Sequence, residues 1–359
     1  MSESEKRDYR QELTSNIMKM VEAGTAPWQK PWNADAAAAH LAMPYNAASG
    51  RAYRGGNSIW LMAKAMEKAE FDPRFVTYNQ AKDNDWQVKK GERGTSVEYW
   101  QFDKEEKRKD PTTGKDETVR IKLDNPRVFY ATVFHASQID GIPKYEPRVP
   151  ENGWKPVEQA ENIMAGSKAK IIHDQVDRAY YAPSSDSVHL PPKEAFPRDV
   201  DYYEVAMHEL AHWSGHESRL NRDLTGSFGS ESYAKEELRA QMASLYLSAE
   251  TGVPFNPDRH ASYQNSWLQV LQNDKNEFFR AAKDAEVIAD YILDLQKEKV
   301  IEKQTDQVKQ NLDKASELLK NHPAMANPAV MELVLNKIGQ RLQEPANEKP
   351  KPQVMEFDR

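Results

Sequence analysis

Cysteine is absent from this chain of 359 residues. Without thiols the protein can form neither disulfides nor thiolate metal sites, which excludes disulfide-stabilised scaffolds and cysteine-bound zinc. The sequence also lacks a run of about 18 apolar residues, and its N-terminal segment MSESEKRDYR lacks the apolar stretch of a signal peptide. We therefore expect a cytoplasmic protein that does not contact a membrane, in which any metal is bound by His, Asp or Glu.

A surplus of positive charge is also missing, since 49 Lys and Arg stand against 56 Asp and Glu, a net charge of −7. Taken alone, this balance argues against nucleic-acid binding. The two halves differ, however: residues 1–150 contain 24 basic and 22 acidic residues, whereas residues 151–359 contain 25 and 34. Because attraction of phosphate depends on the local field, the first half is where a polyanion could bind.

The order of the expected elements indicates an α+β protein of two domains. Residues 1–146 combine helices with strands, and the Pro-rich segment IPKYEPRVPENGWKP favours a boundary near their end. Residues 147–296 form the second domain, with short strands followed by long helices. Residues 297–359 are expected to be a helical extension with a disordered, Pro- and Lys-rich tail.

Strand patterns in the first domain fall at 97–102, 119–123 and 128–134. The charged insert between the first two of these segments predicts a long, solvated hairpin. In the second domain, His189 alternates with Val188 and Leu190 on an expected strand, which favours a half-buried structural histidine. The alternative is that His189 is a residue of a functional site.

The second domain contains the pentad His208-Glu209-Leu210-Ala211-His212, which matches the pattern HExxH. Residues four apart lie on one face of a helix, so both imidazoles can reach one ion. Zinc suits nitrogen donors and keeps an open position in catalytic sites. Glu209 is then placed to accept a proton from the attacking water. Two helix histidines that bind no metal are the simpler alternative.

A third metal ligand is needed, and the residues leave more than one candidate. His216 is disfavoured because Gly215 predicts the end of the helix before it. The next helix, YAKEELRAQMASLYL, offers the carboxylates of Glu236 and Glu237, and the small Ala240 after Glu237 permits close approach of the two helices. Two histidines with one glutamate are an established zinc ligand set, although manganese and cobalt also accept these donors.

The first domain has the residue types that single-stranded DNA favours. Bases stack on aromatic faces without sequence-specific contacts, and basic side chains attract the phosphates. Trp60 and Trp100 are expected to belong to the core instead. The candidate DNA-binding residues are Trp28, Trp32, Tyr53, Arg54, Lys89, Lys90 and Arg93.

Several segments of the chain resemble the ArdC-type antirestriction proteins of plasmids and other mobile elements. They include AGTAPWQKPW, YRGGNSIWL, TYNQAKDNDWQVKKGERGTSV and FYATVFHASQI in the first half, and DRAYYAPSSDSVHLPPKEAF, YYEVAMHELAHWSGHESRLNRDL and FGSESYAKEELRAQMASLYL in the second. The resemblance covers about residues 8–293. It departs from the family at Gln241, where the family's EELVAE has glutamate.

The resemblance implies a single-stranded-DNA-binding domain joined to a zincin-like metallopeptidase domain. It implies a zinc ion, or another divalent metal such as manganese, bound by His208, His212 and Glu237, with Glu209 as general base. The implied function is protection of incoming mobile DNA from host restriction during conjugation, with a host protein or peptide as a further partner. Two alternatives stay open: a DNA-binding module with a purely structural metal site, and the front end of a conjugative primase-like multidomain protein.

Overall fold

The computed structural model describes residues 8–30, 42–68, 70–109, 116–146, 156–256 and 263–320. The chain forms two compact units, Met1–Leu293 and Asp294–Arg359. The fold described below is that of the first unit. Across the described ranges, no helix is both long and apolar enough to cross a bilayer.

The chain begins with helix α1, Tyr9–Glu22, whose first turn is capped by the Asp8 side chain. The buried residues of α1 recur at helical spacing and form one apolar face. The single-turn helix η1, Pro27–Gln29, follows. Of the expected polar extension 297–359, the part up to Lys320 continues helix α8, Glu277–Lys320, and the rest lies outside the described residues.

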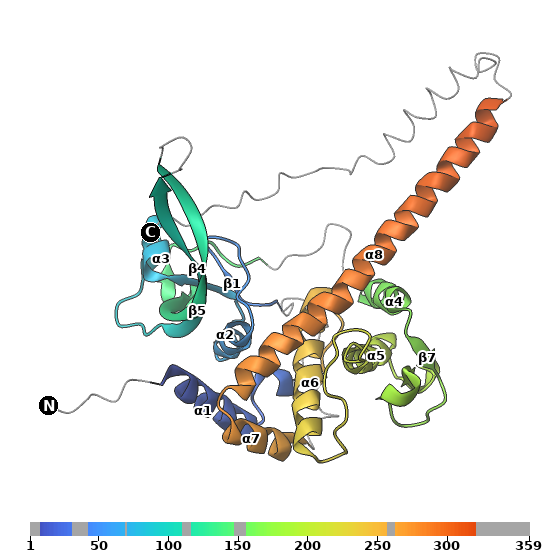
Figure 1. The fold of residues 1–359 in the computed structure, drawn as a ribbon, viewed down its shortest axis with the longest axis horizontal. Helices are drawn as coiled ribbons and strands as arrows, with labels where there is room; N and C mark the ends of the chain where they lie inside the picture. Colours follow the sequence, from blue (N-terminus) through green and yellow to red (C-terminus); the bar gives the residue numbers. More distant parts are fainter. Residues whose placement is uncertain are drawn as a thin grey trace. The chain divides into compact units, whose positions relative to one another are not determined.

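The first predicted domain is built on a four-stranded sheet of order β1-β2-β5-β4 (Figure 1). Its strands are β1 (Tyr45–Asn46), β2 (Arg74–Thr77), β4 (Thr95–Lys109) and β5 (Asp116–His135). Helix α2, Gly56–Met66, packs one apolar face on the sheet, where Leu61 and Ala65 contact Phe75, Val97 and Val133. Helix α3, Tyr78–Asp83, and the short pair β3 (Gln87–Val88) and β6 (Ile139–Asp140) complete this region.

Strands β4 and β5 are much longer than the sequence pattern predicts. The separate strands expected at 119–123 and 128–134 are one strand, β5, which runs antiparallel to β4 out to the pair Lys109 and Asp116. The expected charged insert is therefore mostly strand. Its side chains are largely exposed on both faces, so the hydrophobic pattern that marks a half-buried strand is missing there.

The second half combines a small sheet with a set of helices (Figure 1). The sheet has the order β7-β9-β8, with β7 at Lys170–Ile172, β8 at Tyr180–Ala182 and β9 at Ser187–His189. The expected strand around His189 is thus the central one, and β8 is an edge strand. The helices are α4 (Pro156–Ser167), α5 (Asp199–Trp213), α6 (Glu231–Thr251), α7 (Gln264–Asn273) and α8.

Contacts between the two halves are extensive within the first unit. Helix α1 packs on α7, and η1 packs on both α2 and α6. Arg10 of α1 bridges Glu98 of β4 and Asn276, which lies just before α8. The halves on either side of the boundary expected near residue 146 therefore differ in sequence pattern but pack against each other.

Candidate metal site and nucleic-acid surface

Helix α5 presents the histidines of the HExxH pentad toward helix α6, against which it packs. His208 is buried and His212 nearly so, and their ring centroids lie 4.9 Å apart. One helical turn separates the two rings, so both face the same neighbour. The structure thus brings together the pair that the sequence predicts.

Glu237 of α6 supplies the third donor. Its carboxylate oxygens lie 3.7 Å from Nε2 of His208 and 3.4 Å from Nε2 of His212. One donor atom from each of the three residues lies within 4.8 Å of the others. Two donors about 2.1 Å from one ion in tetrahedral geometry are roughly 3.4 Å apart, so this set fits a divalent metal.

Glu236, the other carboxylate considered from the sequence, contacts the opposite nitrogen of His212. Its Oε1 lies 3.2 Å from Nδ1. Arg222 holds the same carboxylate with two nitrogens, at 2.7 and 3.1 Å, and also donates to the main-chain oxygen of Ala211. A carboxylate on Nδ1 fixes the ring so that Nε2 is free to bind metal.

His208 has an equivalent support, because the hydroxyl of Ser244 lies 3.3 Å from its Nδ1. The hydroxyl itself donates to the main-chain oxygen of Ala240, so it can accept from the imidazole. His216 lies beyond the end of α5 and pairs with Ser218. Gln241 donates to the main-chain oxygen of Trp28, so its amide group serves packing between the two halves.

The charges at this site are strongly coupled. Burial opposes ionisation of Glu237, but the neighbouring His212 and His208 outweigh it and hold the pKa of Glu237 well below its usual value. Burial likewise opposes protonation of His212, yet Glu237 and Glu236 raise the pKa of His212 well above its usual value. A metal ion would therefore compete with a proton for this imidazole.

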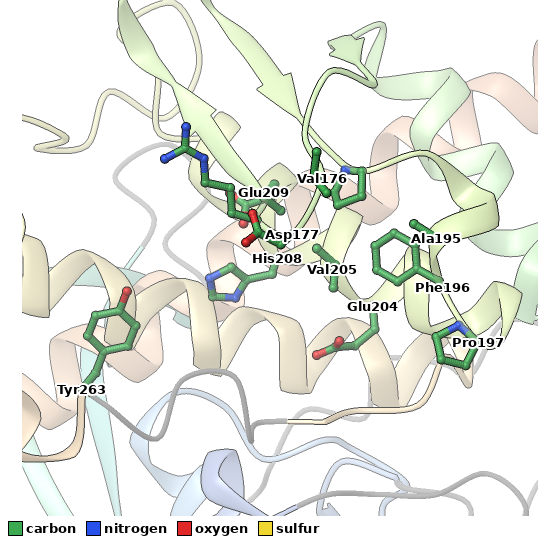
Figure 2. Close-up of a pocket in the computed structure, with 13 residues that line it drawn as sticks. Val176, Asp177, Ala195, Phe196, Pro197, Glu204, Val205, His208, Glu209 and Tyr263 are labelled. Atoms are coloured by element: carbon green, nitrogen blue, oxygen red, sulfur yellow. The ribbon is translucent and has the colours of Figure 1, made fainter.

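Glu209 and His208 are among the residues that line a cleft of about 520 Å³ (Figure 2). Burial raises the pKa of Glu209, against the effect of the two histidines. The main-chain N–H of Tyr181, in edge strand β8, donates to the Glu209 carboxylate. In Figure 2, Tyr263 stands at one end of the cleft and Phe196 at the other.

A second hollow of about 270 Å³ shares His208, Glu209 and Tyr263 with this cleft and is also lined by β8, His212 and Glu237. The candidate ligands therefore border two adjoining cavities, with β8 alongside. Edge strands present unpaired main-chain groups, which can pair with an extended peptide. This arrangement suits a chain that crosses the site rather than a compact small molecule.

Sequence reasoning missed four residues of this site. Tyr233 and Ser244 lie four residues before and seven after Glu237 on α6, so helical spacing alone could have placed them on the same face. The Tyr233 hydroxyl lies 3.0 Å from that of Tyr263. Arg222 lies in the segment after α5 and Tyr263 caps the start of α7, so no spacing rule on α5 or α6 indicates that they reach the site.

The predicted DNA-binding residues have mixed positions. Trp28 is 0% exposed and packs on Phe278, so the prediction that it stacks on a base is wrong. Helix η1 packs against α2 and α6, so the indole ring of Trp28 lies in the core. Trp32 lies outside the described residues. Tyr53 is half-buried against Phe75.

The basic candidates lie at the surface, although two have partners. Arg54 is ion-paired with Glu286 and Asp290 of α8, and Lys89 donates to the main-chain oxygen of Ser137. Lys90 and Arg93 are exposed in the turn before β4. Of the two tryptophans assigned to the core, Trp60 is buried as expected, whereas Trp100 is exposed, which contradicts that expectation.

The fold and the site together define a protein with an ArdC-type N-terminal region and a zincin-like metal site. Residues 7–134 match the family described as the N-terminal domain of anti-restriction factor ArdC, and residues 158–284 match a zincin-like metallopeptidase family. The chain therefore belongs to the ArdC antirestriction family.

Solved structures agree with this assignment. The chain is 35% identical to the metal-free crystal structure of the antirestriction protein ArdC from plasmid R388, with a TM-score of 0.64, covering 81% of this chain and 99% of that one. The Mn(II)-bound structure of the same protein gives 34% identity and a TM-score of 0.65, with 81% and 98% coverage.

Among curated proteins, the chain is similar to the DNA primase TraC of Escherichia coli. The two are 46% identical over 310 residues, which is 84% of this chain and 28% of that TraC. A second E. coli TraC is 45% identical over 304 residues, 83% of this chain and 20% of that protein. The chain thus spans less than a third of the length of these two relatives.

Proposed function

We propose that the protein binds single-stranded DNA through its first half and cleaves a protein substrate at a metal centre in its second half. In this proposal it protects incoming mobile DNA from restriction in the recipient cytoplasm. The convergence of His208, His212 and Glu237 beside Glu209, in a cleft along an edge strand, carries the peptidase part of the proposal. Membership of the ArdC family supports the antirestriction part.

In the proposed hydrolysis, the metal ligands and Glu209 have different roles. His208, His212 and Glu237 would hold a divalent ion, which would supply a Lewis acid for water and for a peptide carbonyl. Glu209 accepts the proton of the attacking water and returns it to the departing amine. Glu209 must accept a proton in one step and donate it in the next. Burial raises its pKa, and a pKa closer to the pH of the reaction suits a group that does both.

Other groups position the substrate and its developing charge. An extended peptide can lie along edge strand β8 and pair with its main-chain groups other than the Tyr181 N–H, which donates to Glu209, and this places the peptide backbone across the cleft. The hydroxyl of Tyr263 faces the same cleft and can donate a hydrogen bond to the carbonyl oxygen as negative charge develops there. Zinc is the proposed ion, and manganese is the alternative, since the similar ArdC structure holds Mn(II).

The test compares Glu209→Gln with wild type in two assays. Cleavage of casein, an unfolded general substrate, is followed with Zn²⁺ or Mn²⁺, and plasmid transfer is counted into restricting and non-restricting recipients. We expect the variant to retain metal but lose cleavage and protection. Glu217→Gln, an exposed glutamate just beyond α5, is the matched control and should behave as wild type.

Other outcomes lead to different conclusions. Metal loss in Glu209→Gln would contradict the role of general base. Full protection by Glu209→Gln would favour the alternative in which the chain acts by binding DNA and its metal site is structural. The proposal and this alternative both include DNA binding by the first half. They differ in whether the cleft cleaves a substrate.

A second function, as the front end of a longer primase-like protein, is favoured by the identity to TraC over nearly the whole described fold. In that case this segment would deliver single-stranded template to a separate polymerase. Primer synthesis on an oligothymidylate template tests it. We expect this chain to bind the template without making primers, and primer synthesis would assign it the primase activity itself.

A further inference from the structure

The ribbon formed by β4 and β5 exposes an unusual number of aromatic side chains. Among the described residues, five of the seven exposed aromatic side chains lie on these two strands: Tyr99, Trp100, Phe102, Phe129 and Tyr130. Exposed apolar groups that gather in one patch, unlike scattered single ones, often mark a site of interaction. Two of them differ from the rest in how they are placed.

Tyr99 and Phe129 lie directly opposite each other in the ladder and stack, with ring centroids 5.3 Å apart and an interplanar angle of 20°. They are 54% and 38% exposed. Val97, two residues earlier on the same face of β4, is buried against Leu61 of α2. The stacked pair therefore continues the core face of the sheet past the point where its helix cover ends.

The opposite face of the ribbon already has protein partners. Tyr130 packs on Tyr9 of α1 at 4.6 Å between centroids. Trp100 donates to Glu98, and the guanidinium of Arg10 lies over the Trp100 ring while binding the same Glu98. In the described chain, Tyr99 and Phe129 have ring contacts with each other alone.

A basic side chain accompanies the stacked pair. Arg127 lies two residues before Phe129 and pairs with Gln101 in the ladder, so it projects from the same face of the ribbon. It is exposed and makes no ion pair within the described ranges, in contrast to Arg54 and Arg10. Residues i and i+2 of a strand lie roughly 7 Å apart, so the guanidinium of Arg127 lies beside the stacked rings along the same face.

We propose that Tyr99, Phe129 and Arg127 form a base-stacking site for single-stranded DNA, with the rings on the bases and the guanidinium on a phosphate. This site rests on the proposed DNA-binding function and takes the role that the buried Trp28 cannot fill. Stacking on exposed rings is tolerant of sequence and requires unpaired bases, so duplex DNA is a poor ligand.

The test measures binding of a labelled oligothymidylate by fluorescence anisotropy to the full chain. The double variant Tyr99→Ala/Phe129→Ala should weaken binding at least about tenfold. The exchange Tyr99→Phe/Phe129→Tyr keeps both rings and should bind as wild type. Arg127→Gln should weaken binding less and lower the salt dependence by about one released counterion.

Tyr78→Ala is the matched control, because Tyr78 is an exposed aromatic residue of the same half that lies on α3 and not on the ribbon. It should leave affinity unchanged. All three aromatic residues are exposed, so loss of the stacked pair should remove no more than about 1 kcal/mol of stability, and circular dichroism can verify that the variants remain folded.

The outcomes separate this site from the function on which it rests. If the wild type does not bind single strands, the proposed DNA-binding function itself fails. If the wild type binds and the double variant binds equally well, DNA binding stands and this site is wrong. If the double variant instead loses self-association in sedimentation, with DNA affinity intact, the rings cover a second copy of the chain and the proposal is also overturned.

Discussion

The two adjacent glutamates of α6 allow a sharp test of the metal site. Glu237 faces Nε2 of both histidines, whereas Glu236 contacts Nδ1 of His212 and is held by Arg222. Replacing each by glutamine keeps the size of the side chain and removes one charge. The structure predicts different consequences, since one change removes a metal ligand and the other a support for a ligand.

For Glu236→Gln we expect metal affinity to fall about 10- to 100-fold, the usual effect of losing a carboxylate behind a ligating histidine, or about 1.4 to 2.8 kcal/mol. The amide oxygen can still accept from His212, which limits the loss. Arg222 would keep its contacts to Ala211 and Ser214 but lose its buried counter-charge. We therefore also expect the metal-free variant to lose about 3 kcal/mol of unfolding free energy.

For Glu237→Gln we expect a larger loss of metal affinity, because a charged donor is replaced by a weakly coordinating amide. Chelator competition with Zn²⁺ and Mn²⁺ measures both variants, and urea unfolding without metal measures stability. Glu231→Gln, an exposed glutamate at the start of the same helix, is the control and should match wild type. Wild-type affinity in Glu237→Gln together with lost binding in Glu236→Gln would reverse the two assignments and refute the reasoning.

Three further predictions follow from individual groups. Metal affinity should fall as the pH falls, because the carboxylates beside His212 raise its pKa and a proton then competes for the ring; equal affinity at pH 6 and pH 8 by chelator competition would contradict this. Tyr263→Phe should lower kcat for peptide cleavage by about 10- to 1000-fold with little change in KM, as removal of one hydrogen-bond donor to a developing oxyanion does. His135 is buried, and burial lowers the pKa of its imidazole in the folded protein. The stability that this neutral imidazole contributes is fully present above the unfolded-state pKa near 6.5, and it should be lost as the pH falls from there through the lower pKa of the folded state. Urea unfolding between pH 5 and pH 7 should show this decline, and His135→Gln should reduce it.

Some parts of the fold could be predicted because their signals are local. The apolar face of α1 recurs at helical spacing from Tyr9 to Val21, and the HExxH pentad needs one regular helix for its two imidazoles to share a face. The ends of these helices also agree with capping and breaker residues, as at Asp8 and Gly215. Each of these features depends on neighbours within a few residues.

The ribbon of β4 and β5 shows where local pattern fails. Beyond Gln101 the side chains of β4 are mostly charged and exposed, and in β5 half-buried residues alternate with exposed ones only over the short segment 119–123. Hydrogen bonds to the partner strand define the structure there, and the partner is found by pairing in space. The burial of Trp28 and the exposure of Trp100 have the same cause, since composition indicates aromatic rings but not which of them a helix will cover.

By itself, the sequence determined that a metal must be held without thiols, that two histidines and a general base share one helix, and that an acidic glutamate pair on the next long helix could complete the site. Spacing along the chain left both members of that pair open, and the resemblance pointed to Glu237; tertiary structure shows how the two differ. The rotation of α6 against α5 directs Glu237 to Nε2 of the histidines and Glu236 to Nδ1 of His212, while Arg222 comes from the segment after α5 and Tyr263 from the start of α7. Helix rotation and loop path depend on packing of the whole core, which is why spacing along the chain could not specify them.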